Sequence, residues 1–181
     1  DGRNKGMPEI VRLSEDTIPR DLLLNFQHDQ IIARKFVKQG DAWIITESGE
    51  IRTWDQDKRV WITEYLKQQI GRGGFAAGAF ENGVCIGLGS MDGYLRGRTA
   101  EYANFTMLFV DDRWKRKGIG SRLFQEIAKC AREKGAKKLF LSAIPAVETI
   151  QFYLSLGCVD AEERIESYID TAEDRCLEYK L

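Results

Sequence analysis

The sequence predicts one domain of the α/β (α+β) class, in which helices flank a mixed, mostly antiparallel central sheet. Two observations carry this prediction. The first half of the 181-residue chain contains pairs of extended segments joined by turns, and the second half alternates extended and helical segments. The chain is long enough to bury a core without disulfides or metal ions. Its 43% hydrophobic and 30% charged residues are ordinary for a globular protein.

The first elements are short. Residues 10–13 form an apolar run that predicts a strand. Pro19, followed by Asp21, is typical of the first turn of a helix, so a helix is expected from Pro19 through the apolar residues up to Phe26. Residues 36–45 predict a hairpin, because two apolar runs flank a polar turn.

A longer helix and a second hairpin follow. Residues 54–70 place aromatic and aliphatic side chains close to helical spacing, and the pattern stops at Gly71, which predicts a helix. Residues 75–91 predict a hairpin whose turn contains Asn82 and Gly83, because an Asn-Gly pair readily adopts positive φ.

The second half contains the clearest patterns. Residues 102–110 predict a central strand, because their apolar character is nearly continuous toward the end. Residues 118–134 predict an amphipathic helix with apolar residues four positions apart. The remaining expected elements are a strand at 138–143, a helix at 147–156, and strands beginning in 158–163 and 176–181.

Composition argues against several classes of function. The net charge of −1 gives no electrostatic reason to expect nucleic acid or a membrane as partner, and no apolar run approaches the roughly 20 residues of a membrane span. The four cysteines form no Cys-x-x-Cys pair, so they are expected to be reduced and buried, which suits a cytoplasmic protein without a metal site. His28 is the single histidine and lies in a polar stretch, so it is expected at the surface.

The polar residues 1–6 lack the apolar centre of a secretory leader. They are expected to be an added or disordered leader, with Met7 as a candidate start residue.

The segment that indicates chemistry follows the strand ending at Val110. Three consecutive cations, Lys115 to Lys117, lead into a helix that begins on Gly118 and Gly120. A helix N-terminus presents unpaired N–H groups and partial positive charge, and glycines allow an anion to approach the backbone. Ordinary helix capping on a solvated surface, or a short basic patch, could also produce this pattern. The spacing differs from that of P-loops and of dinucleotide-binding loops.

This segment resembles the pyrophosphate loop of the GNAT superfamily of N-acetyltransferases, which reads Gln/Arg-x-x-Gly-x-Gly/Ala, with Lys115 in the first position. A second signature of the superfamily, a helix containing Phe-Tyr and ending in Gly plus an aromatic residue, is similar to Phe152-Tyr153 followed by Gly157 and Cys158. Ala146 stands where the superfamily often has Asn. The resemblance covers residues 75–157, about half of the chain.

The resemblance implies acetyl-CoA as co-substrate, no metal, and a strand ending at Val110 that splays away from the strand at 138–143. The backbone N–H of Leu108 would polarise the acetyl carbonyl, and Tyr153 would protonate the leaving thiolate. A half-buried helix aromatic without chemistry is the alternative for Tyr153. The implied cofactor-binding residues are Leu108, Phe109, Val110, Lys115, Arg116, Lys117, Gly118, Ile119, Gly120 and Ser121.

The resemblance also implies a small-molecule amine as acceptor and is compatible with a homodimer. Two alternatives remain within the same fold, namely an acyl-CoA-binding sensor or scaffold without turnover and a transferase for a longer acyl group.

The acceptor is expected to approach between the segments 54–73 and 101–106. Aromatic rings and carboxylates there suit a small cationic amine rather than a folded protein tail. Glu101 is the candidate base for the ammonium proton, and a solvated Glu at a strand start is the alternative. The candidate lining residues are Trp54, Trp61, Glu64, Tyr65, Tyr102 and Phe105, although the spacing of Trp61 and Tyr65 is also typical of core residues.

Overall fold

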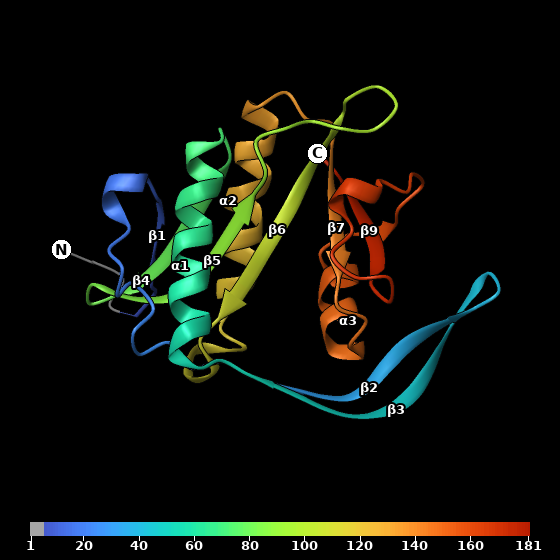
Figure 1. Ribbon diagram of the computed structural model, residues 1–181, viewed down its shortest axis with the longest axis horizontal. Helices are drawn as coiled ribbons and strands as arrows, with labels where there is room; N and C mark the ends of the chain where they lie inside the picture. The colour runs from blue at the N-terminus through green and yellow to red at the C-terminus, as the bar shows by residue number, and fades with distance from the viewer. Residues whose placement is uncertain (1–5) are drawn as a thin grey trace.

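The computed structural model, which describes residues 6–181, contains a seven-stranded sheet flanked by helices and a separate two-stranded ribbon (Figure 1). The order of strands in the large sheet is β1-β4-β5-β6-β7-β9-β8. Neighbouring strands are antiparallel except β6 and β7, which are parallel. The predicted class, a mixed and mostly antiparallel sheet flanked by helices, is confirmed. The leader expected at residues 1–6 lies outside the described residues apart from Gly6.

The strands are β1 (Glu9–Arg12), β2 (Asp29–Gln39), β3 (Ala42–Thr53), β4 (Phe75–Glu81), β5 (Val84–Met91), β6 (Tyr102–Val110), β7 (Lys138–Ala143), β8 (Val159–Asp160) and β9 (Arg175–Lys180). The helices are α1 (Gln56–Gly71), α2 (Ile119–Glu133) and α3 (Val147–Ser155). Short 3-10 turns, labelled η1 (Glu15–Thr17), η2 (Asp112–Trp114) and η3 (Glu166–Tyr168), connect some of them. Within residues 6–181 no helix is both long and apolar enough to cross a membrane.

The alternation of side chains along β4 assigns one helix to each face of the sheet. Ala77 and Ala79 belong to the core cluster formed with α2, whereas Ala76, the residue before Ala77, belongs to the cluster formed with α1. Figure 1 shows α1 in front of the strands and α2 behind them. The apolar stripe of α2, predicted from its spacing, is fully buried, with Leu123 and Ile127 both 0% exposed.

The strands β6 and β7 separate half-way along β6. Their parallel ladder begins with Tyr102 opposite Lys138 and ends with Phe105 opposite Leu141. On the other side of β6, the register with β5 shifts so that Thr106 is an extra residue, a β-bulge. Figure 1 shows β6 and β7 diverging toward the C-terminal end of β6. The splayed strands expected at the cofactor site are therefore confirmed.

The first predicted hairpin is much longer than residues 36–45, because β2 and β3 extend over 29–53. The ribbon runs from the end of β6 to the start of α3. The N–H of Asp29 donates to Oδ2 of Asp112 at 2.7 Å, and the N–H of Phe36 donates to the carbonyl of Pro145 at 2.7 Å. Ile32, which lies between these two anchors, is 2% exposed.

Two expected elements differ from the structure. The helix expected from Pro19 is a series of turns, in which the N–H groups of Leu22, Leu24 and Phe26 donate three residues back rather than four. The structure buries Phe26 under α1, and this packing, rather than a helical ladder, holds the segment. The strand expected in 158–163 is limited to the two residues of β8, because the chain then turns toward η3.

Candidate active site

The loop between β6 and α2 has the backbone geometry of an anion-binding site. Arg116 and Gly118 have φ values of 61° and 79°, and α2 begins at Ile119 with Gly118 as its N-cap. The N–H of Arg122 donates to the carbonyl of Gly118, so the N–H groups before Arg122 have no acceptor within the helix. A Cβ placed on Gly118 would meet no atom within 4 Å. The loop therefore leaves open space in front of several unpaired donors, as a diphosphate requires.

The three cations of this loop differ in their contacts. Lys115 pairs with Asp112 at 2.6 Å, and the Nζ of Lys117 lies 4.7 Å from the centre of the Trp114 ring. Arg116 is exposed, and the structure gives it no ion pair within residues 6–181. Arg122, in the first turn of α2, has a buried Nη1 without a hydrogen-bond partner in the same range. Arg116 is consequently the cation of the three that is least engaged with the protein itself.

Asp111 joins this loop to the N-terminal segment. Its side chain is 1% exposed and accepts hydrogen bonds from the N–H of Gln27 at 3.0 Å, from the N–H of Arg113, and from the guanidinium of Arg113 at 2.8 Å. Burial alone would raise the pKa of Asp111, but these donors outweigh burial and lower the pKa. The carboxylate therefore stays charged and holds the end of β6 in place.

The open edge of β6 presents the backbone groups of Leu108 and Val110. The N–H of Asp111 donates to the carbonyl of Ile86 at 2.8 Å, which places Asp111 in a hydrogen-bonded pair with β5. In an antiparallel ladder such pairs alternate with pairs whose N–H and C=O groups face away. The backbone groups of Leu108 and Val110 therefore face the side where β7 has diverged. This is the placement that a backbone donor from Leu108 requires.

Tyr153 reaches β6 from α3. Its ring lies 6.4 Å from that of Phe105 and 6.3 Å from that of Phe124, and its side chain is 9% exposed. Burial and the nearby Cys158 raise the pKa of its phenol, so the hydroxyl stays protonated near neutral pH. Within residues 6–181 the hydroxyl has no hydrogen-bond partner. A protonated phenol of this kind can act as an acid.

Glu101 is not brought to these groups. It precedes β6, where its carbonyl accepts from the N–H groups of Lys137 and Lys138. Seven residues of strand, at about 3.3 Å each, place it about 23 Å from Leu108. That separation is too large for direct proton transfer, so the interpretation of Glu101 as a base lacks geometric support. Tyr102 is likewise remote, because its hydroxyl is buried against Glu178.

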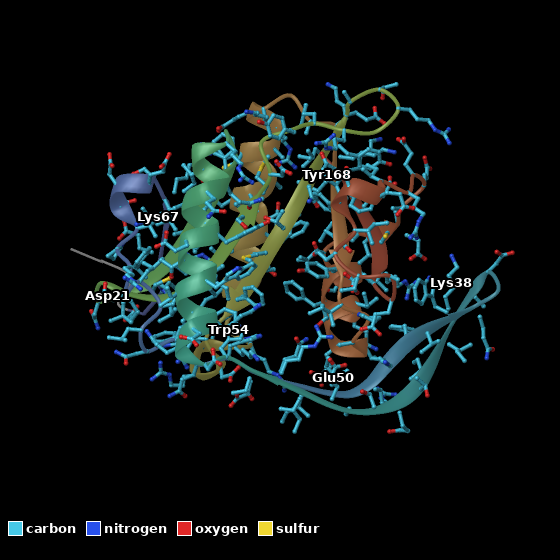
Figure 2. The ribbon with its side chains drawn as sticks, viewed as in Figure 1. Asp21, Lys38, Glu50, Trp54, Lys67 and Tyr168 are labelled. Atoms are coloured by element: carbon cyan, nitrogen blue, oxygen red, sulfur yellow. The ribbon has the colours of Figure 1, made fainter. Side chains whose placement is uncertain are left out.

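The remaining aromatic candidates divide between core and surface. Trp61 is 52% exposed and stacks on Tyr65 at 5.3 Å between ring centroids, so the core alternative is wrong for Trp61. Phe105 is buried in the cluster with α2. Trp54 is 7% exposed and lies where β3 runs into α1 (Figure 2).

His28 is half-buried rather than fully exposed, which corrects the expectation from its polar neighbours. Its ring lies 4.9 Å from that of Trp54 and 5.1 Å from that of Phe109, beside the C-terminal end of β6. Burial, together with the nearby positive charge of Lys115, lowers its pKa. The N–H of Trp54 donates to the His28 carbonyl, so the roots of the ribbon and β6 share one aromatic cluster.

Two carboxylates on the β7 side of the gap were missed by the sequence prediction. The hydroxyl of Ser142, the first residue of β7 beyond the ladder, donates to Asp174 at 2.8 Å, and the N–H of Asp170 donates to the same hydroxyl. Asp174 is 9% exposed, and no cation pairs with either carboxylate within residues 6–181. Burial and the charge of Asp174 raise the pKa of Asp170. No periodic pattern marks these residues, because they lie in an irregular loop after η3.

Asp170 also acts on a residue of α1. Tyr65 of α1 has a pKa raised by burial and by the charges of Asp170 and Asp92. The gap between β6 and β7 therefore has a negatively charged wall near β7 and a tyrosine-bearing wall near β6.

Comparison with known proteins decides the family. Residues 41–158 match the acetyltransferase (GNAT) family. The chain belongs to the GNAT family of acetyltransferases. The resemblance stated from the pyrophosphate-loop motif is thus confirmed, and the match extends well before residue 75. No curated protein matches the sequence significantly.

Solved structures share the fold of this GNAT protein at low identity. The PaiA N-acetyltransferase of Thermoplasma acidophilum in complex with coenzyme A has a TM-score of 0.61 at 17% identity, covering 96% of this chain and 99% of its own. Nourseothricin acetyltransferase has a TM-score of 0.63 at 16% identity, with coverage of 93% and 95%. Aminoglycoside 6'-N-acetyltransferase complexed with coenzyme A has a TM-score of 0.53 at 14% identity, with coverage of 68% and 80%.

The buried carboxylate of Asp111 leads to a prediction about the stability of the fold. Asp111→Asn should lower the free energy of unfolding by about 1.5–3 kcal/mol at neutral pH, because charge-assisted hydrogen bonds are lost. The pKa of Asp111 is lowered in the folded state, so its contribution is present above the usual carboxyl pKa of about 3.9 and is lost as pH falls below that value. Urea unfolding at pH 7 and pH 3 measures both effects.

The matched control is Asp41→Asn, in the exposed turn of the ribbon, which should change stability by less than about 0.5 kcal/mol. A destabilisation by Asp111→Asn that is as large at pH 3 as at pH 7 would show that the carboxylate charge is not what matters.

Proposed function

We propose that this protein transfers the acetyl group of acetyl-CoA to a primary amine of a small cationic molecule. One observation carries the proposal. The open edge of β6 at Leu108 and Val110 is joined by the loop 111–118 to the start of α2, whose first N–H groups are unpaired, so one extended ligand could pair with the strand and place its diphosphate on the loop. Two of the structural neighbours named above were solved with coenzyme A.

The residues proposed to hold acetyl-CoA follow from that arrangement. The backbone groups of Leu108 and Val110 would pair with the pantetheine arm, whereas those of Phe109 face β5. The loop from Lys115 to Ser121 would bind the pyrophosphate through N–H groups. Arg116 supplies the least engaged charge of the loop. Acetyl-CoA itself supplies an activated thioester.

Two groups would act on the thioester, one on its carbonyl oxygen and the other on its leaving sulfur. The N–H of Leu108 faces the open edge and would stabilise negative charge that develops on the carbonyl oxygen. Tyr153 would deliver its phenolic proton to the thiolate as it leaves, for which a buried and protonated phenol is suited.

The acceptor would bind on the α1 side of the gap. Asp170 and Asp174 attract a cation on the β7 wall, where neither carboxylate has a cationic partner within residues 6–181. The raised pKa of Asp170 also suits it, better than the distant Glu101, to receive the ammonium proton. Two of the neighbours named above are acetyltransferases for nourseothricin and for an aminoglycoside, which favours an amine-bearing small molecule.

The test of this function is a panel of amine acceptors assayed for thiol release from acetyl-CoA. We expect release to depend on polycationic amines such as polyamines and aminoglycosides, and to be weak with neutral or acidic amines and with peptides. Thermal-shift measurements with acetyl-, propionyl- and succinyl-CoA should favour acetyl-CoA. Binding of acetyl-CoA without acceptor-dependent thiol release would indicate a sensor or scaffold. A preference for propionyl- or succinyl-CoA would mean that the protein transfers an acyl group other than acetyl.

The loop generates a second prediction. Gly120→Val should weaken acetyl-CoA binding by more than about tenfold, or 1.4 kcal/mol, because the side chain blocks the backbone at the diphosphate. Isothermal calorimetry measures the dissociation constant. A Cβ on Gly120 would lie 3.2 Å from the Phe152 ring, so the single variant also strains the packing of α3.

Two further variants separate binding from packing. Gly120→Val combined with Phe152→Leu should recover stability without recovering affinity. Gly49→Val serves as the control, because no atom lies within 4 Å of a Cβ at Gly49. Normal affinity in the double variant would mean that residues 115–121 are not the phosphate site.

Tyr153→Phe should lower turnover by about 10²-fold while leaving acetyl-CoA affinity near that of the wild type, because only the proton donor is removed. Steady-state kinetics and calorimetry together measure this separation. The control is Tyr179→Phe, which removes a hydroxyl from a ring that packs on the same Phe124 and should leave turnover unchanged. Unchanged turnover in Tyr153→Phe would mean that another group protonates the thiolate, and equal loss of affinity would indicate a packing role.

A further inference from the structure

A chain of four polar side chains lies on the α1 side of the bulge in β6. The hydroxyl oxygens of Ser90 and Thr106 are 2.7 Å apart, Oγ1 of Thr106 is 2.6 Å from Oε1 of Gln69, and Nε2 of Gln69 is 3.1 Å from the hydroxyl of Tyr65. Ser90 is 0% exposed and Gln69 is 8% exposed. The chain thus begins in the buried sheet and ends at the half-buried Tyr65.

The number of protons fixes the direction of every bond in this chain. The amide oxygen of Gln69 can only accept, so the single hydroxyl proton of Thr106 is donated to Gln69. Ser90 must then donate to Thr106, and the amide nitrogen of Gln69 donates to the oxygen of Tyr65. The hydroxyls of Ser90 and Thr106 therefore both donate in the direction of α1.

The distances support this orientation of the Gln69 amide. A separation of 2.6 Å is typical of an O–H···O bond and too short for N–H···O, whereas 3.1 Å is typical of N–H···O. Reversing the amide would also leave one proton of the Ser90–Thr106 pair without an acceptor among residues 6–181. The bond lengths and the count of acceptors therefore support the same orientation of the Gln69 amide.

The Tyr65 hydroxyl is left with an unused proton. Its oxygen already accepts from Gln69. The Thr106 hydroxyl lies close enough to act on the pKa of Tyr65, yet no acceptor for the Tyr65 O–H lies in hydrogen-bond geometry within residues 6–181. Stacking on Trp61 holds the ring in place, with an angle of 18° between the ring planes. Thr106, which orders the chain, is two residues from Leu108, whose N–H faces the open edge. The hydrogen-bonded chain that orients Tyr65 therefore joins β6 two residues from Leu108, where the acceptor amine would react.

Resting on the function proposed above, we propose that Tyr65 selects acceptors that carry a hydrogen-bond-accepting oxygen close to the reacting amine. The hydroxyl of Tyr65 donates to that oxygen, while Asp170 on the opposite wall attracts the ammonium group. Amino alcohols and amino sugars have this pair of groups on adjacent carbons, and simple alkyl polyamines have only the amines. The site is therefore built for a vicinal amino alcohol.

Matched amines test this inference. The probes are 1,3-diamino-2-propanol and 1,3-diaminopropane, which differ by one hydroxyl, and 2-aminocyclohexanol with cyclohexylamine. We expect the wild type to prefer the hydroxylated member of each pair in kcat/KM. Tyr65→Phe keeps the ring on Trp61 and should lower kcat/KM for the hydroxylated member by about five- to tenfold, while changing its partner by less than about twofold.

A second variant removes the free proton without touching Tyr65. Gln69→Glu replaces the donor amide by a carboxylate that only accepts, so Tyr65 would donate inward and the preference should again be lost. Gln68→Glu introduces the same charge at the neighbouring exposed position and should keep the preference.

The outcomes separate the inference from the function on which it rests. Equal losses on both members of each pair, or an unchanged ratio in Tyr65→Phe, would overturn the role of Tyr65 while leaving the acetyltransferase assignment intact. Absence of thiol release with every amine in the wild type would instead overturn the proposed function.

Discussion

The structure depends most on the point where the parallel ladder between β6 and β7 stops. The ladder ends at Phe105 and Leu141, and the bulge at Thr106 lies immediately beyond it. A central strand with an unpaired edge is costly, because buried N–H and C=O groups need partners. The chain retains such an edge at Leu108 and Val110, and the proposed acetyl-CoA complex would pair it with an extended ligand.

The rest of the molecule holds the two walls of this opening apart. On the β6 side, the buried Asp111 ties the strand end to Gln27, and His28, Trp54 and Phe109 pack as one aromatic cluster. On the β7 side, the ribbon is hydrogen-bonded to the start of α3 at Pro145. One continuous segment, β2, therefore contacts both walls, so the width of the opening is determined by tertiary contacts far apart in the sequence.

The two faces of the opening have different chemistry. The face toward α2 is apolar around Tyr153 and ends at the cationic loop, which suits a thioester with a diphosphate. The face toward α1 has hydroxyls and an amide in a directed chain, and it meets two carboxylates without cationic partners in the described residues. This division places the proposed donor and acceptor on opposite sides of one strand, with Leu108 between them.

Local patterns predicted the elements that carry their own signals. Strict helical spacing predicted α2 within one residue at each end, and the turn at Asn82 and Gly83 predicted the β4–β5 hairpin. The glycines of the loop after β6 predicted the helix start with its unpaired N–H groups, because φ preference and N–H exposure are properties of a few adjacent residues. The motifs at Lys115–Gly120 and Phe152–Tyr153 likewise sufficed to identify the family.

Properties that require distant segments to meet could not be predicted in this way. Glu101 was chosen for its nearness in sequence to the cofactor strand, yet the strand itself places it at the far end. The charge of Asp170 acts on Tyr65 only because η3 packs against β7, and His28 is half-buried only because Trp54 and Phe109 enclose it. The sequence alone determined the family, the main elements and the glycine-marked start of α2, because these depend on local spacing and backbone preference. The acceptor side was decided by tertiary packing, because its charges and hydrogen bonds join residues between 4 and more than 100 positions apart.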